Sequence, residues 1–136
     1  MAVTRRQLLA IALTTPFAGV LSACGGSSGG SSGGSAGTAG SADAPVTEVT
    51  VTSPSTSFDI TTIYVPVGQP VTVTYRNDDE GVPHNFHVSG SGVDDKTTLK
   101  SGPDVQTITV TFPAAGDYDY ICDVHADSMT GIVTAV

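Results

Sequence analysis

The residues best suited to chemistry are a cysteine, two histidines and a methionine in the C-terminal half of the chain. Cys122, His125 and Met129 lie close together, and His84 lies about forty residues upstream. Thiolate, imidazole and thioether are the ligands of a trigonal copper site with two histidines, one cysteine and a weak axial methionine. Because soft sulfur suits Cu(I) and imidazole suits copper generally, this set favours one-electron transfer.

Each of these residues also has a plainer interpretation. A cysteine can be a small core residue, a histidine can be structural, and a methionine usually belongs to the core. The clustering favours ligation, because His125 and Met129 would both point back from a loop toward the strand that ends at Cys122. For the axial position of Met129, a backbone carbonyl or an open copper face is the alternative.

The elements that must position these residues are β-strands. Alternation of apolar residues and threonine in residues 48–52, 71–75 and 106–112 predicts half-buried antiparallel strands. In residues 116–122 the same period places Tyr118, Tyr120 and Cys122 on one buried face. No helical periodicity lasts more than a turn, so we expect an all-β, Greek-key β-sandwich of seven or eight strands over residues 45–136.

Residues near His84 divide between the site and the surface. Pro83 stiffens the approach to the strand that follows His84. Phe86 is expected in the core beside the site. His87 lies three positions from His84 and would project to the opposite face, so it is interpreted as a surface histidine.

Several segments of the chain carry a resemblance to a known family: Val-Pro-Val-Gly at 65–68, Gly-Val-Pro-His-Asn-Phe at 81–86, residues 116–122, His125, Met129 and Gly131. In these segments the chain resembles the cupredoxins, the small blue-copper proteins of the plastocyanin, halocyanin and amicyanin type. The resemblance implies one type 1 copper per chain, held by His84, Cys122, His125 and Met129. The spacing of His125 and Met129 is intermediate between those of plastocyanin and amicyanin.

The resemblance also implies roles for single residues. Cys122 would couple the copper electronically, and His125 would be the electron port through an apolar surface patch. Asn85 would tie the two ligand loops together by hydrogen bonds. Independently of the family, a carboxylate at Asp123 or Asp127 would favour Cu(II). The acidic run at 78–80 is interpreted as a solvated turn.

The N-terminal residues predict export and a lipid anchor. Arg5 and Arg6 precede a short apolar segment at 10–21, which is typical of a signal peptide rather than a membrane span. Twin-arginine and general secretory export both fit. Residues 21–24 resemble a bacterial lipobox, so residues 1–23 would be removed and Cys24 lipidated. Ordinary cleavage is the alternative, but Leu21 is too large for it.

Residues 24–44 predict a tether. After Cys24 they contain only Gly, Ser, Ala, Thr and one Asp, which cannot form a core. A flexible chain of this length spans on the order of 25 Å on average. Lipidation of Cys24 would leave Cys122 a lone thiol in an oxidising compartment, where we expect it to be buried or bound to metal.

The net charge of the chain indicates which classes of macromolecule it could bind. The chain has a formal charge of −8, and without Arg5 and Arg6 three basic residues face thirteen acidic ones. We therefore do not expect nucleic acid as a partner, because phosphate binding needs Lys and Arg, whereas redox proteins with basic surfaces fit. A solubility role for the charge is equally compatible.

Together these observations predict an exported, monomeric electron carrier, which its N-terminal lipid anchors to the outer face of the cytoplasmic membrane or holds in the periplasm. Copper delivery is the alternative, and a metal-free adhesive sandwich leaves the Cys, His and Met cluster unexplained. An enzyme is not expected, because three histidines are too few for additional copper centres. We expect no small-molecule substrate.

Overall fold

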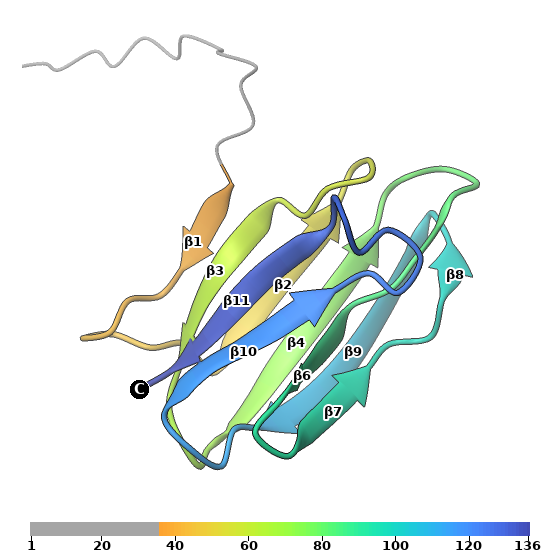
Figure 1. Cartoon of the computed structure of the whole chain (residues 1–136). Helices are drawn as coiled ribbons and strands as arrows, with labels where there is room; N and C mark the ends of the chain where they lie inside the picture. The colour runs from red at the N-terminus through yellow and green to blue at the C-terminus, as the bar shows by residue number, and fades with distance from the viewer. Residues whose placement is uncertain (1–35) are drawn as a thin grey trace, which may run out of the picture. The chain divides into compact units, whose positions relative to one another are not determined.

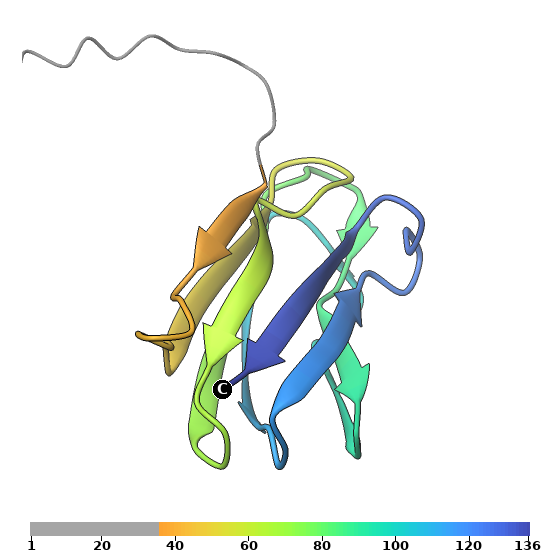
Figure 2. The same cartoon turned by 60° about the vertical axis from the view of Figure 1, so that its left-hand side comes forward.

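The computed structural model describes residues 36–136, in which the regular elements are β-strands arranged in facing layers (Figure 1, Figure 2). The strands are β1 (Gly37–Ala39), β2 (Glu48–Ser53), β3 (Ile60–Val65), β4 (Pro70–Asn77), β5 (Pro83–His84), β6 (His87–Gly90), β7 (Val93–Lys96), β8 (Lys100–Ser101), β9 (Asp104–Thr111), β10 (Gly116–Ile121) and β11 (Thr130–Ala135). The predicted signal peptide, the lipobox and Cys24 lie outside the described residues. Within that part of the chain, no helix is long and apolar enough to cross a membrane.

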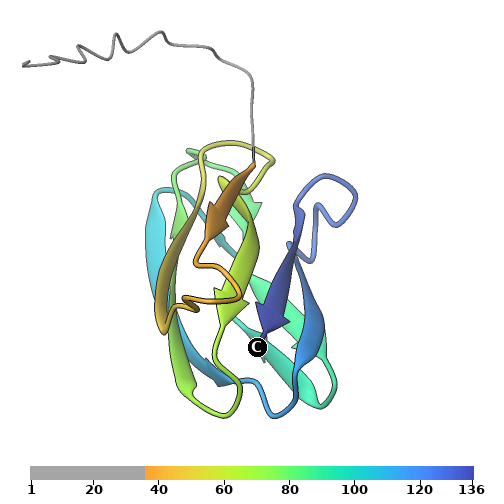
Figure 3. The same ribbon diagram turned by 90° about the vertical axis from the view of Figure 1, so that its left-hand side faces the viewer.

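The predicted all-β sandwich is confirmed. One sheet has the strand order β1-β3-β11-β10-β6-β7, a second has the order β2-β4-β9, and β5 pairs with β8. In Figure 3 the strands β10 and β11 lie on one side of the core and β2 and β9 on the other. The eight strands of four or more residues agree with the predicted number, and β1, β5 and β8 are shorter additions.

The core lies between the two main sheets, and it is formed by every second residue of the strands. In β4, Val71, Val73 and Tyr75 are buried, whereas the intervening Thr72 and Thr74 are only half-buried. Successive side chains of a strand point to opposite faces, so the valines and tyrosine face the other sheet. This confirms the predicted buried face of the segment.

The antiparallel direction expected for the strand over residues 48–52 is wrong. β2 and β4 are parallel neighbours, with Thr50 opposite Thr74, whereas we expected antiparallel strands. Parallel neighbours need a crossover, and here the chain passes through β3 in the other sheet before it returns as β4. β4 and β9 are antiparallel, as expected.

Among the described residues, a short strand, β1, precedes residue 45, where we expect the copper domain to begin. β1 lies within the predicted linker and pairs in parallel with β3. The Gly37 amide donates a hydrogen bond of 2.8 Å to the Asp59 carbonyl. A Cβ at Gly37 would lie 2.9 Å from that oxygen, so glycine suits the close approach. Backbone pairing adds this strand to the sheet, and its Ala39 packs against the core.

Buried aromatic rings fill the core beneath the end of β10. The Tyr120 ring lies 4.7 Å from Phe86 and 5.2 Å from Phe58, measured between centroids. Its hydroxyl donates a hydrogen bond to the Ile60 carbonyl. Burial raises the pKa of Tyr75 to about 12, and its hydroxyl is paired with Ser53. The polar ends of the tyrosines are thus satisfied inside the core.

Gly131 on β11 makes room for Tyr120. The two residues are cross-strand partners, and a Cβ at Gly131 would overlap the Tyr120 ring. Because a packed interior cannot absorb an added methyl group freely, this glycine positions the ring that supports the strand carrying Cys122.

Substitution of Gly131 by alanine should therefore destabilise the domain. We expect Gly131→Ala to lower the free energy of unfolding by about 1–3 kcal/mol, the usual cost of overpacking. Urea unfolding of the metal-free protein measures it. Thr130→Ala, at an exposed neighbouring position, is the control and should change little. Equal stability of Gly131→Ala and the wild type would mean that the Tyr120 ring is not confined.

Candidate metal centre

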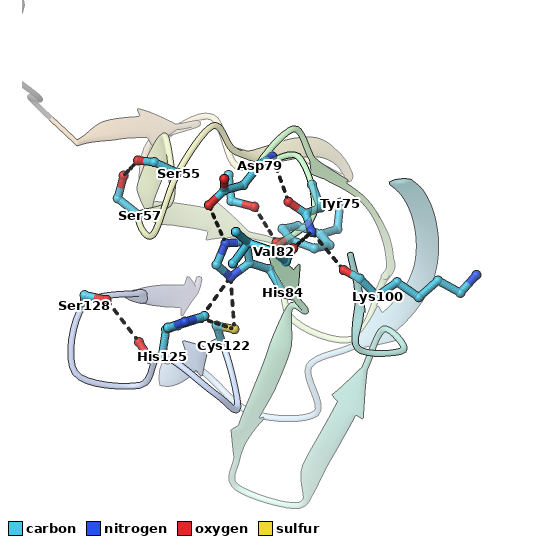
Figure 4. Close-up of polar contacts among 12 residues, drawn as sticks. Ser55, Ser57, Tyr75, Asp79, Val82, His84, Lys100, Cys122, His125 and Ser128 are labelled. Carbon is cyan, nitrogen blue, oxygen red and sulfur yellow. Dashed lines mark hydrogen bonds and ion pairs between the residues drawn. The ribbon is translucent and has the colours of Figure 1, made fainter. Parts of the chain in front are cut away.

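Two segments far apart in sequence meet at one end of the sandwich. Cys122 directly follows β10 and begins the loop that leads to β11, while His84 ends the short strand β5. Figure 4 shows the side chains of His84, Cys122 and His125 directed toward one another. Tyr118, Tyr120 and Cys122 are all buried, which confirms the predicted face of β10.

The loop from Cys122 to Met129 is closed by its own backbone. The Cys122 amide donates to the Met129 carbonyl at 3.0 Å, and the Met129 amide donates to the His125 carbonyl at 2.8 Å. The His125 amide in turn donates to the Cys122 carbonyl at 3.1 Å. These bonds hold the ends of the loop together and place His125 over Cys122.

Three donor atoms converge closely enough to share one ion. The Cys122 Sγ lies 3.7 Å from the His84 Nδ1 and 3.8 Å from the His125 Nδ1, and the two nitrogens are 3.0 Å apart. Metal bonds of about 2.0–2.1 Å to imidazole and about 2.3 Å to thiolate, as in zinc sites, add up to more than each separation. A single metal ion therefore fits among them, and the three residues form a metal-binding cluster.

The candidate ligands differ in how far they are exposed to solvent. Cys122, His84 and Met129 are fully buried, whereas His125 is half-buried. Val124, beside His125, is 48 % exposed. Met129 is buried at the far end of the same loop, and its carbonyl is bonded to the Cys122 amide. His84, Cys122, His125 and Met129 are thus positioned as a copper site. Of these four residues, His125 alone is partly exposed to solvent.

Asn85 joins the two ligand segments. Its Nδ2 donates to the Asp123 Oδ2 at 2.9 Å, and its Oδ1 accepts from the Asp123 backbone amide at 2.9 Å. Asn85 follows His84 and Asp123 follows Cys122, so this reciprocal pair fixes the distance between the segments. The arrangement matches the linking role that the resemblance implied.

His87 lies outside the metal cluster, as predicted, but it is not a freely solvated residue. Its Nδ1 lies 2.6 Å from the Asp123 Oδ1, and its Nε2 lies 2.7 Å from the Asp94 Oδ1. Carboxylates accept hydrogen bonds, so both ring nitrogens donate when the ring is protonated. The hydrogen bond to Asp123, and after it the one to Asp94, raises the pKa of His87 above its ordinary value, against the effect of burial.

The charge of Asp123 is balanced within this network. Burial pushes the pKa of Asp123 upward, but hydrogen bonds from His87 and Asn85 outweigh it and lower the pKa overall. The Lys96 Nζ lies 3.4 Å from the Asp123 Oδ2. Asp123 is therefore paired with Lys96, and with a positive His87 when that ring is protonated. These partners offset the charge through which we expect Asp123 to favour Cu(II).

Sequence reasoning missed Asp79. The acidic run at 78–80 was expected to be a solvated turn, and Asp78 fits this because it is paired with Arg76 at the surface. Asp79 differs, since its Oδ2 lies 3.0 Å from the Nε2 of the fully buried His84. Nothing in the sequence distinguishes the two aspartates; only the folded turn brings one of them to the ring.

The pKa shift of His87 predicts a pH dependence of stability. A folded-state pKa above the unfolded value of about 6.5 stabilises the fold fully below that pH. This contribution is lost as the pH rises through the folded-state pKa. We expect the free energy of unfolding of the metal-free protein to fall over this window, and His87→Gln to reduce the fall. Urea titrations at several pH values test this, and an equal slope in the variant would contradict it.

Comparison with known proteins agrees with this geometry. Residues 30–135 match the family described as Cupredoxin-like domain. The chain is 35 % identical to auracyanin-A of Chloroflexus aurantiacus, over 96 % of this chain and 97 % of that protein.

Solved structures give the same fold. The structure of auracyanin A from Chloroflexus aurantiacus, described as a "blue" copper protein, superposes with a TM-score of 0.58 and 23 % identity over 68 % of this chain and 99 % of that chain. A copper-containing nitrite reductase from Thermus scotoductus has a TM-score of 0.52 and 26 % identity over 65 % of this chain but only 22 % of its own. The chain thus belongs to the cupredoxin family, and its cofactor is type 1 copper.

Proposed function

We propose that this protein is a mobile one-electron carrier, tethered through a lipidated Cys24 to the outer face of the cytoplasmic membrane. Bound copper supplies the chemistry by alternating between Cu(II) and Cu(I). The proposal rests chiefly on one observation: the donor atoms of His84, Cys122 and His125 converge within 3.8 Å of one another in a largely buried site. Met129 is proposed as the axial ligand.

The protein contributes rigidity to this function. The ligand loop is closed by backbone hydrogen bonds, and Asn85 joins it to the segment of His84. Ligands held in this way need to move little when the charge of the metal changes. His125 is the ligand nearest solvent and is proposed as the point of electron exchange with partner proteins.

Composition supports redox proteins with basic surfaces as partners. The chain carries thirteen acidic residues and five basic ones, and complementary charge accelerates the encounter of proteins. The same excess of acid argues against nucleic acid. We propose that the carrier acts as a monomer and has no small-molecule substrate.

A carrier is favoured over an enzyme by the number of histidines. The chain has three, and His87 is engaged by Asp94 and Asp123, which leaves His84 and His125 for one copper ion. The nitrite reductase matched above is much longer than this chain, which corresponds to 22 % of it. Copper delivery is the alternative function, and the half-buried His125 would allow it.

A Cu(II) titration of the purified metal-free protein tests the carrier. We expect one copper per chain, an intense blue thiolate-to-copper absorption band and a narrow copper hyperfine splitting in EPR, as a type 1 site requires. Cys122→Ser should abolish the band, because it removes the thiolate.

His87→Gln is the matched control and should keep the band, because this third histidine lies outside the cluster. Met129→Leu should keep the band and change the reduction potential, because the weak axial ligand tunes it. Colourless or easily removed copper would instead support delivery. Failure to bind copper would refute both functions.

Membrane attachment is tested separately through Cys24. We expect the wild type in the membrane fraction of cells, with residues 1–23 removed and Cys24 acylated. Cys24→Ala should carry no acyl chain and should keep residues 1–23, because Leu21 is too large for ordinary cleavage. Metabolic labelling with a fatty-acid analogue should mark only the wild type. A wild type that carries no label and keeps residues 1–23 would show that Cys24 is not the anchor.

A further inference from the structure

We infer that Asp79 is a positioning residue of the copper centre, which holds His84 in the ligating tautomer and favours Cu(II) over Cu(I). The inference deepens the proposed function and rests on it for its redox part. Its starting point is the contact of 3.0 Å between the Asp79 Oδ2 and the His84 Nε2, drawn in Figure 4. The other ring nitrogen, Nδ1, faces Cys122 and His125.

The chemistry of the contact assigns the proton. A carboxylate can only accept a hydrogen bond, so the His84 Nε2 must donate and carries the hydrogen. In the neutral ring Nδ1 then has a free lone pair, and it is this atom that lies among the donor atoms of the site. A metal ligand needs such a lone pair, and a hydrogen-bond acceptor on the far nitrogen also orients the ring.

Asp79 is itself held in place by a buried residue. Asn77 is 1 % exposed, and its Oδ1 accepts a 3.0 Å hydrogen bond from the Asp79 backbone amide. Its Nδ2 donates to the carbonyls of Val82 and Lys100 at 2.8 and 2.9 Å. One amide side chain therefore ties the turn after β4 to the residue before β5 and to β8. The Asp79 backbone cannot move far without breaking these bonds.

Close packing against Gly102 completes the support. A Cβ at Gly102 would lie 2.5 Å from the Asp79 carbonyl oxygen and 2.8 Å from that of Asn77. The Gly102 carbonyl accepts a 3.0 Å hydrogen bond from the Gly81 amide. These contacts fix the backbone of Asp79, from which its carboxylate reaches His84.

The charge of Asp79 acts on the metal through a fully buried ring. The Asp79 side chain is 22 % exposed and that of His84 is 0 % exposed, so water screens this contact less than a surface pair. A negative charge bonded to a ligand makes that ligand a stronger donor, which favours the more highly charged ion. Asp123, by contrast, is paired with His87 and Lys96.

The neighbouring Asp78 offers a matched control. It lies on the same turn and carries the same formal charge, but its side chain is 39 % exposed and pairs with Arg76 at 3.2 Å. Asp78→Asn therefore removes one negative charge from the same turn without removing a contact to His84.

The first experiment measures the tautomer of His84 by ¹⁵N NMR in the metal-free protein at about pH 8, where an ordinary histidine is neutral. We expect hydrogen on Nε2 in the wild type and in Asp78→Asn, and a smaller fraction of this tautomer in Asp79→Ala, where only the intrinsic preference of the ring remains. Hydrogen on Nδ1 in the wild type, or an unchanged tautomer in Asp79→Ala, would overturn the inference. This result does not depend on copper, so it is independent of whether the protein is a carrier.

The second experiment compares reduction potentials of the copper-loaded proteins. We expect Asp79→Asn, which keeps an oxygen acceptor but not the charge, to shift the preference from Cu(II) to Cu(I) about tenfold. For one electron this is a rise of about 59 mV. Asp78→Asn should shift the potential much less, and equal shifts would overturn the redox role. Urea unfolding of each variant verifies that the fold is retained.

Discussion

Two reciprocal hydrogen bonds between Asn85 and Asp123 hold the ligand-bearing end of the domain together. Each residue directly follows a ligand, so the bonds fix how far His84 lies from Cys122. The backbone bonds within the loop from Cys122 to Met129 set the remaining geometry. The two main sheets supply a rigid base for both segments, because buried aromatic rings fill the core directly beneath them. The metal centre is therefore held together mainly by hydrogen bonds within and between its two ligand segments, at one end of the sandwich.

Two carboxylates close to the site have different electrostatic surroundings. Asp123 joins a network with His87 and Lys96, and its negative charge is compensated there. Asp79 instead contacts the ring of a buried ligand. Proximity in sequence to a ligand is thus a poor guide to electrostatic influence: Asp123 is adjacent to Cys122, whereas Asp79 lies five residues before His84 and contacts it across a turn.

Much of the fold and most of the candidate site could be predicted from the sequence, because alternation along a strand shows which side chains are buried. A strand period of two determines which face is buried, and this placed Tyr118, Tyr120 and Cys122 correctly. The same period carries no information about the direction of a neighbouring strand, so the parallel pairing of β2 with β4 was missed. β1 was missed because it pairs through backbone groups of small residues. Asp79 was missed because only the folded turn brings it to His84.

The pairing of β1 also has a mechanical consequence. A pull applied at its N-terminal end would act along the strand and load its backbone hydrogen bonds to β3 in shear. β1 is an edge strand of only three residues, at the far side of β3 and β11 from β10. Its detachment would release roughly 10 Å of chain, at about 3.3 Å per residue. Such an extensible segment would absorb strain during docking while the ligand loop stays undistorted.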